Sequence, residues 1–176
     1  SQRPADLTPG VKNWGVTFSK PWAETLGLDW REAYLVILDD LKAKSLRLPA
    51  YWTEIEKQEG VYSFEDLDWQ INEAEKRGVK VILAVGRRLP RWPECHVPQW
   101  AQNLESRKQN LELLDYISAV VERYKNNPAI QYWQVENEPF LKFGVCPKLD
   151  KEFLDKELAL VHSLDSRPII VTDSGE

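Results

Sequence analysis

The chain has 176 residues, of which 43% are hydrophobic and 29% charged, a composition typical of one globular domain with a hydrophobic core. Its formal net charge of −5 argues against nucleic acid as a partner, because nucleic-acid binding requires a basic face. The apolar runs are only a few residues long, so no segment is expected to span a membrane, and no amphipathic basic segment suggests binding to a membrane surface.

Three residue types give further information. The eight Trp are many for this length; Trp serves either in a core or as a flat surface on which sugar rings stack. The chain contains no Met, so we expect a processed form or an excised piece of a longer protein. No signal peptide is visible, and localisation stays open, with export to the periplasm or cell exterior as one alternative.

Short apolar runs alternate with helical patterns along the chain. The first 12 residues contain Pro and Gly and are expected to be an irregular lead-in to a single domain over 13–176. The expected strands are 14–19, 45–49, 79–85, 129–135 and 169–173. The expected helices are 29–44, 64–77, 106–124 and 150–164, with Asp29 and Asp150 as N-caps and Gly78 as a stop signal. The expected loops are 20–28, 50–63, 87–103 and 140–149.

This alternation predicts parallel strands covered by helices, in either a barrel or a doubly wound sheet. No Gly-rich phosphate turn follows any strand, so nothing supports the nucleotide-binding form. Polar residues at the ends of the second, third and fourth strands suit a ring of loops around a barrel mouth. A (β/α)8 barrel needs about 250 residues. The fold class predicted is therefore a partial α/β barrel of about five parallel strands.

The most informative stretch is Glu136-Asn137-Glu138-Pro139, which ends the fourth strand. Pro139 cannot donate a hydrogen bond to a neighbouring strand and stops the strand there. Two carboxylates at the end of a buried strand are costly unless they face a ligand, and the carboxyl ends of parallel strands are where ligands bind.

Asn137-Glu138-Pro139 after an apolar strand resembles the signature of the retaining, cellulase-type glycoside hydrolases with a (β/α)8 barrel. The resemblance covers the chain from about Trp14 onward and about five-eighths of that barrel. It implies that Glu138 is the general acid/base, that Asn137 contacts the sugar 2-hydroxyl, and that Arg47 orients the nucleophile. Arg47 could instead form a structural ion pair inside the barrel, with Glu136 as a candidate partner.

The family nucleophile sits on the seventh strand, which these 176 residues do not reach. Asp173 and Glu176 would stand beside Glu138 rather than across the sugar from it, so neither fits a retaining mechanism well. Activity of the isolated chain therefore stays open. The missing C-terminal half of the barrel is expected as a partner, in the same chain or another.

Several loop residues are candidates for substrate contact. Trp22, Trp52, Trp92 and Trp100 follow strands on the expected active face, where each is either a sugar platform or a loop anchor. His96 is either a substrate contact or an exposed loop residue.

No cofactor is expected, and no metal, since no His, Cys and carboxylate cluster has ligand spacing. Cys95 and Cys146 lie in loops that neighbour each other around a barrel mouth, and are either bridged or two free thiols.

Two functions of different class remain. In the first, the chain is part of a retaining glycosidase that acts on β-linked oligo- or polysaccharides through Glu138. In the second, it belongs to a barrel that binds carbohydrate without cleaving it, for which the many Trp and the missing nucleophile speak.

Overall fold

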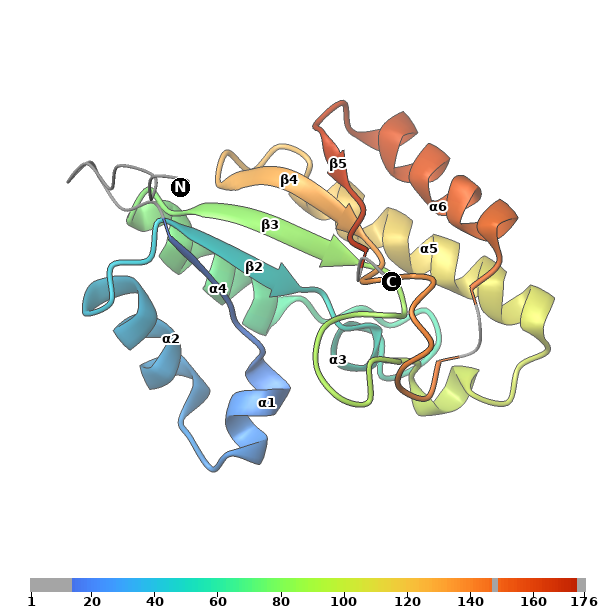
Figure 1. The fold of residues 1–176 in the computed structure, drawn as a ribbon, viewed down its shortest axis with the longest axis horizontal. Coiled ribbons are helices and arrows are strands. Elements are labelled where there is room, and N and C mark those ends of the chain that lie inside the picture. The colour runs from blue at the N-terminus through green and yellow to red at the C-terminus, as the bar shows by residue number, and fades with distance from the viewer. Residues whose placement is uncertain (1–13, 147–148, 174–176) are drawn as a thin grey trace, which may run out of the picture.

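A computed structural model describes residues 14–146 and 149–173 (Figure 1). Five parallel strands form one sheet in the order β1-β2-β3-β4-β5, which is also their order along the chain. The strands are β1 Gly15–Thr17, β2 Ser45–Pro49, β3 Lys80–Val85, β4 Ile130–Val135 and β5 Ile169–Ile170. Sequential parallel neighbours joined by helical crossovers are the arrangement of a barrel wall rather than of a doubly wound sheet.

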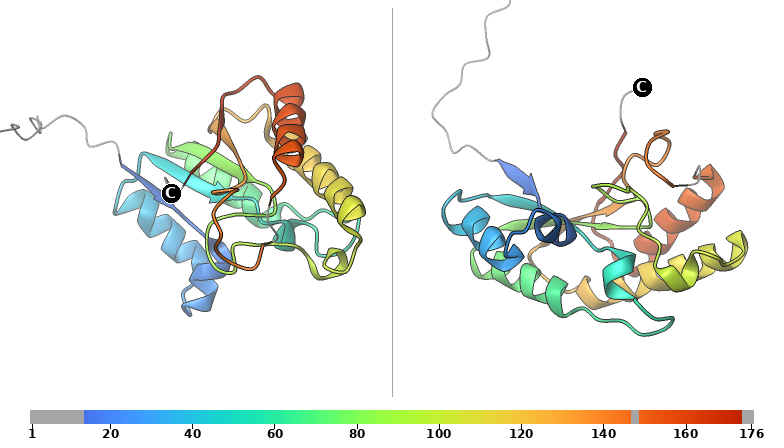
Figure 2. Two further views of the ribbon diagram at one scale, coloured as in Figure 1. Left: turned by 45° about the vertical axis from the view of Figure 1, so that its right-hand side comes forward. Right: turned by 90° about the horizontal axis from the view of Figure 1, so that it is seen from below.

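The helices connect these strands and cover one face of the curved sheet (Figure 2). The α-helices are α1 Lys20–Thr25, α2 Trp30–Asp39, α3 Trp52–Ile55, α4 Glu65–Lys76, α5 Ser106–Tyr124 and α6 Lys151–Leu164, and a 3-10 helix spans Gln99–Ala101. Within the described residues, no helix has both the length and the apolar character needed to cross a bilayer.

Predicted capping and stop residues mark the ends of several helices. Asp29 caps α2 by accepting hydrogen bonds from the backbone N–H groups of Arg31 and Glu32 at 2.8 and 3.1 Å. Asp150 likewise caps α6. Gly78, with φ of +66°, follows α4 in the left-handed conformation that ends many helices.

Several elements differ from prediction, including β1, which spans only Gly15–Thr17 of the predicted 14–19. The segment 20–28 contains α1, because Ser19 caps it and Pro21 suits the first turn of a helix. Helix α2 ends at Asp39 rather than Lys44, and Lys42 has a φ of +54°, which no helix accommodates. The predicted loops 50–63 and 87–103 contain α3 and the 3-10 helix, and strand β5 is only two residues long.

Apolar residues of the strands and helices form one main core. Its largest fully buried side chains include Trp52, Trp133, Tyr34 and Tyr116. The Tyr116 hydroxyl donates to the carbonyl of Ala50, just after β2, and so ties α5 to the loop end of the sheet. The predicted lead-in, residues 1–12, and Glu176 lie outside the described residues, so the predicted domain limits stay a prediction.

Candidate active site

The chain leaves regular strand geometry where β4 ends. Glu136 and Glu138 have φ values of +59° and +47°, in the left-handed region that side chains other than Gly rarely adopt. The alternation of side chains along a regular strand, which would place residues two apart on one face, therefore does not apply to these two carboxylates. Glu136 is fully buried and accepts hydrogen bonds from the backbone N–H groups of Arg87 and Arg88 at 3.0 and 2.6 Å. It ties the end of β4 to the loop after β3.

Asn137 is held by a network of side chains from the neighbouring strands. Its Oδ1 accepts from Arg47 Nη1 at 3.2 Å and from Gln134 Nε2 at 3.3 Å. Its Nδ2 lies 3.4 Å from Glu138 Oε2 and donates to it. The guanidinium of Arg47 is fixed in turn by the Thr17 hydroxyl at 2.9 Å and by Gln134 Oε1 at 3.3 Å. This network sets which end of the Asn137 amide faces the acid.

Glu138 is half-buried, and its backbone N–H donates to the Thr172 hydroxyl at 2.9 Å. Burial, and then the charge of Arg91, lower the pKa of the Arg47 guanidinium, while the Glu138 carboxylate acts in the opposite direction. Arg47 and Glu138 are thus within electrostatic reach of each other. Arg47 makes its bonds to neutral groups, while Glu136 binds backbone amides, so the alternative ion pair between Arg47 and Glu136 is wrong.

Arg47 and Gln134, which hold Asn137, line an open hollow of about 300 Å³. Thr17, Arg47, Gln134 and Thr172 line it, so each of β1, β2 and β4 and the segment after β5 supplies a polar group. The hollow therefore converges on one patch of donors and acceptors, as ligand sites do.

The loops after β3 and β4 are joined above this patch. Cys95 and Cys146 form a disulfide with their Cα atoms 4.9 Å apart, which confirms the bridge over the alternative of two free thiols. The backbone N–H of Val145 donates to the Pro93 carbonyl at 3.2 Å. A Cβ on Gly144 would lie 2.6 Å from that same oxygen, so the two loops are in close backbone contact.

The joined loops bring a second carboxyl group to the acid. Burial raises the pKa of Glu94; Arg88 opposes this shift, and the Glu138 carboxylate adds to it. Asn137 interacts with the Glu94 side chain as well and lowers its pKa. Asn137 therefore lies among two acids and one guanidinium.

The aromatic candidates separate by exposure. Trp22 and Trp92 are 38% and 60% exposed, and the Trp92 ring meets that of Phe143, at a centroid distance of 6.1 Å. Both have surface on which a sugar could stack. Trp52 is wholly buried, so it serves as a loop anchor and not as a sugar platform. Trp100 is also an anchor, because its indole N–H donates to the carbonyl of Glu56 at 2.8 Å.

His96 fits neither of its predicted roles. Its ring is buried and packs on Tyr51 at a centroid distance of 4.2 Å. Burial lowers its pKa to about 4, which the carbonyls of Arg91 and Leu89 partly oppose. His96 therefore stays neutral inside the loop after β3 and is removed from the candidate substrate contacts.

Sequence reasoning missed four polar residues of this region: Gln134, Thr172, Glu94 and Glu157. Gln134 could have been found from the sequence, because it lies between the apolar residues Trp133 and Val135 of a strand and a buried Gln there needs a hydrogen-bond partner. Thr172 and Glu94 carry none, because only the folded loops bring them to Glu138.

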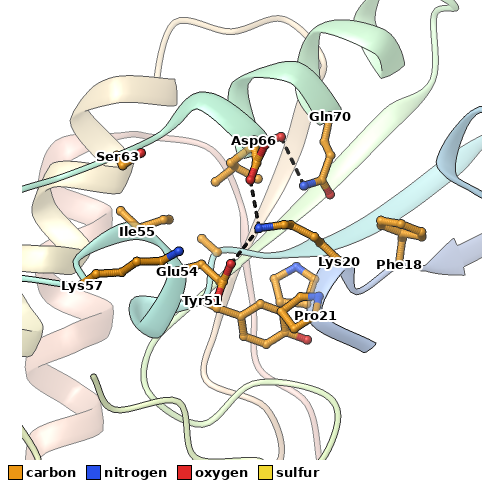
Figure 3. A pocket seen from close by; sticks show the side chains of 13 residues that line it. Phe18, Lys20, Pro21, Tyr51, Glu54, Ile55, Lys57, Ser63, Asp66 and Gln70 are labelled. Atoms are coloured by element: carbon orange, nitrogen blue, oxygen red, sulfur yellow. Dashed lines mark hydrogen bonds and ion pairs between the residues drawn. The ribbon is translucent and has the colours of Figure 1, made fainter. Parts of the chain in front are cut away.

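A separate pocket lies between α1, α3 and α4 (Figure 3). Lys20 enters it and pairs with Glu54 at 2.8 Å and Asp66 at 2.9 Å. Its volume of about 70 Å³ is well below the several hundred Å³ typical of ligand sites. Lys20 is neutralised by these two carboxylates, so this part of the pocket is an internal ion-pair cluster.

Among the described residues, no group of three or more His, Cys, Asp or Glu side chains is arranged to hold a metal ion. The chemistry available at the patch is therefore that of carboxyl, amide, guanidinium and hydroxyl groups.

The sequence model of the glycoside hydrolase 42 family, described as beta-galactosidase, matches residues 32–162. The chain belongs to this family. Among curated relatives, the beta-galactosidase Pbg of Clostridium perfringens is 26% identical over 82% of this chain and 25% of its own length. A probable mannan endo-1,4-beta-mannosidase A-1 of Aspergillus terreus is 29% identical over 61% of this chain and 29% of its own length. The chain thus spans about a quarter of these relatives.

Solved structures with similar folds are also glycoside hydrolases. The GH5_18 protein of Streptomyces cattleya, solved with GlcNAc, aligns with a TM-score of 0.70 at 15% identity, over 92% of this chain and 44% of its own. Xylanase 10B of Thermotoga petrophila, solved with xylobiose, aligns with a TM-score of 0.65 at 18% identity, over 92% of this chain and 49% of its own. This glycoside hydrolase 42 chain therefore has the fold of a partial (β/α)8 barrel of the cellulase type, as predicted.

Proposed function

We propose that the whole protein is a retaining glycosidase that acts on β-linked sugars, with Glu138 as its general acid/base. The observation that carries this proposal is the Asn137–Glu138 pair at the carboxyl end of β4, where Asn137 is held by Arg47, Gln134 and Thr172, three polar residues that line the open hollow. In barrels of this kind, active sites lie at that end of the strands. The family membership and the relatives that are named as beta-galactosidase and mannosidase support the same reaction class.

In this proposal the Glu138 carboxyl protonates the departing glycosidic oxygen and then removes a proton from the attacking water. Asn137 donates its amide N–H toward the sugar, since its oxygen is occupied by Arg47 and Gln134. Retention requires a nucleophilic carboxylate about 5–5.5 Å from the acid, on the other side of the anomeric carbon. We propose that this nucleophile lies outside residues 1–176 and that Arg47 helps to orient it.

Trp22 and Trp92 are the proposed stacking surfaces for an oligo- or polysaccharide, because both are exposed on the loop side of the sheet. The sugar and the linkage are open: the two curated relatives compared above differ in their named substrates.

The test is Glu138→Gln in the whole protein, assayed on two glycosides of one sugar. A poor leaving group needs protonation, so its turnover should fall by about 100-fold or more, whereas a good leaving group needs little and its first step should survive. Glu122→Gln on α5 is the matched control, since its exposed carboxylate pairs only with Lys125 among the described residues. Unchanged hydrolysis of the poor leaving group by Glu138→Gln would remove Glu138 from the mechanism.

A further inference from the structure

The buried carboxyl of Glu157 has no role in the reaction as proposed. It lies on α6 with 0% of the residue exposed, and neither of its oxygens meets a hydrogen-bond donor among the described residues. A buried carboxylate without donors is very costly, so this group must carry a proton. A protonated carboxyl is itself a donor and needs an acceptor.

That acceptor is Glu136. The two carboxyl groups interact and both side chains are fully buried, so a proton on Glu157 has the Glu136 carboxylate within reach. Burial raises the pKa of Glu136 as well, but Glu136 accepts two backbone N–H groups, from Arg87 and Arg88, and these favour its charged form. The arrangement therefore assigns the negative charge to Glu136 and the proton to Glu157.

We propose that Glu157 is a positioning residue, whose protonated carboxyl donates to the Glu136 carboxylate and so holds the turn that carries Asn137 and Glu138. The turn needs such support because Glu136 and Glu138 both have positive φ. The Glu157 carboxyl, on the helix layer, is thereby coupled to the acid through Glu136. This inference rests on the proposed role of Glu138.

The charges around the pair agree with a single shared proton. Burial raises the pKa of Glu157 well above its ordinary value, and the charge of Glu136 adds to the shift. The opposing cation is Arg87, from the loop after β3, whose Nη1 is held by Gln109 and Asn110 of α5 at 3.0 and 3.3 Å. Burial raises the pKa of Tyr116, on α5, and the charge of Glu136 adds to this shift.

A proton held in this way makes stability depend on pH. The unfolded chain releases it near the ordinary pKa of Glu, about 4.3, whereas the folded chain keeps it to higher pH. The contribution is fully present below the unfolded pKa and is lost as pH rises toward the folded one. Over that range, the folding equilibrium constant falls by up to about tenfold per pH unit.

The experiment compares Glu157→Gln with the unchanged protein in denaturant titrations from pH 4.5 to 8. The Gln amide can donate to Glu136 but cannot lose a proton, so this variant should lack the fall in stability with pH and should gain on wild type at each higher pH. Glu152→Gln, an exposed carboxylate on the same helix, is the control and should follow wild type. Parallel pH profiles for Glu157→Gln and wild type would overturn the shared proton.

The positioning role is tested by Glu157→Met, which keeps the volume and removes the donor. Its kcat should fall by about tenfold or more on a glycoside with a poor leaving group and much less on one with a good leaving group, with KM unchanged, while Glu157→Gln retains most activity. Equal losses on both glycosides would overturn the positioning role. If Glu157→Met does not fold, the positioning role would be overturned by Glu157→Gln losing its activity on the glycoside with the poor leaving group. Failure of the proposed function would be recognised separately, because Glu138→Gln would then remain active while the stability profiles of Glu157→Gln and wild type against pH would still differ.

Discussion

Gly86, which follows β3, is the position where an added methyl group should do most damage to the candidate site. Its φ is +127°, in a region open essentially to Gly alone. A Cβ there would lie 2.6 Å from the Glu136 carboxyl carbon and 2.7 Å from its Oε1. Since that carboxylate is fully buried and holds two backbone N–H groups, it has little room to withdraw without losing a bond.

The cost of Gly86→Ala can be worked out from these contacts. The backbone conformation costs about 1–3 kcal/mol for a residue other than Gly. Loss of one hydrogen bond to the buried carboxylate adds about 1.5–3 kcal/mol. We expect a decrease of about 4 kcal/mol in the free energy of unfolding, with loss of activity because the turn holding Glu138 shifts.

Gly78→Ala is the matched control. Gly78 also has positive φ, +66°, but nothing lies within 4 Å of its added Cβ, so only the left-handed backbone cost of about 1–2 kcal/mol applies. Both variants are measured by denaturant unfolding followed by Trp fluorescence, with kcat/KM alongside. The reasoning is refuted if Gly86→Ala costs no more than Gly78→Ala and retains full activity.

Two further predictions concern the loop after β3. The disulfide between Cys95 and Cys146 closes a loop of 51 residues, and the chain-entropy model gives about 4 kcal/mol for that length. Replacing both Cys by Ser should lower stability by up to about that amount in the oxidised protein, and intact-mass analysis of native protein should find no alkylated thiol at either position. His96, whose pKa burial lowers to about 4, binds fewer protons folded than unfolded. The free energy of unfolding should therefore decrease by about 3 kcal/mol as pH falls from about 6.5 to 4. His96→Phe should show a smaller decrease over this range. The same decrease in His96→Phe and wild type would show that His96 is accessible to solvent.

The architecture could be predicted because its signals are local. Each strand is a short apolar run, and caps such as Asp29 and Asp150 and the stop at Gly78 are defined by a few neighbouring residues. The misplaced segments depend on less local information. Helix α1 has only one buried residue, Ala23, so no apolar periodicity marks it. Helix α3 lies within the predicted loop 50–63 and could not be predicted from local sequence, because its fully buried Trp52 is fixed by packing on Tyr116 of α5.

The candidate site divides in the same way. Asn137, Glu138 and Arg47 could be found because they interrupt apolar strands, where a charge or amide needs a reason. The partners that orient them could not. Thr172 lies 34 residues from Glu138, and Glu157 reaches Glu136 only through the packing of α6 on the sheet. Exposure also decides roles that sequence leaves open, since Trp52 and Trp92 both follow strands but only Trp92 is on the surface.

The central claim is that Glu138 is the acid/base of a retaining mechanism, and chemical rescue tests it most directly. In Glu138→Ala, an activated β-glycoside should still form the glycosyl-enzyme, but water lacks a base and the intermediate accumulates. Azide needs no deprotonation: it forms a C–N bond at the anomeric carbon while the enzyme carboxylate leaves with its electron pair. The account predicts that azide accelerates turnover of Glu138→Ala, has no such effect on wild type, and yields the β-glycosyl azide. No acceleration by azide, or an α-glycosyl azide, would contradict it.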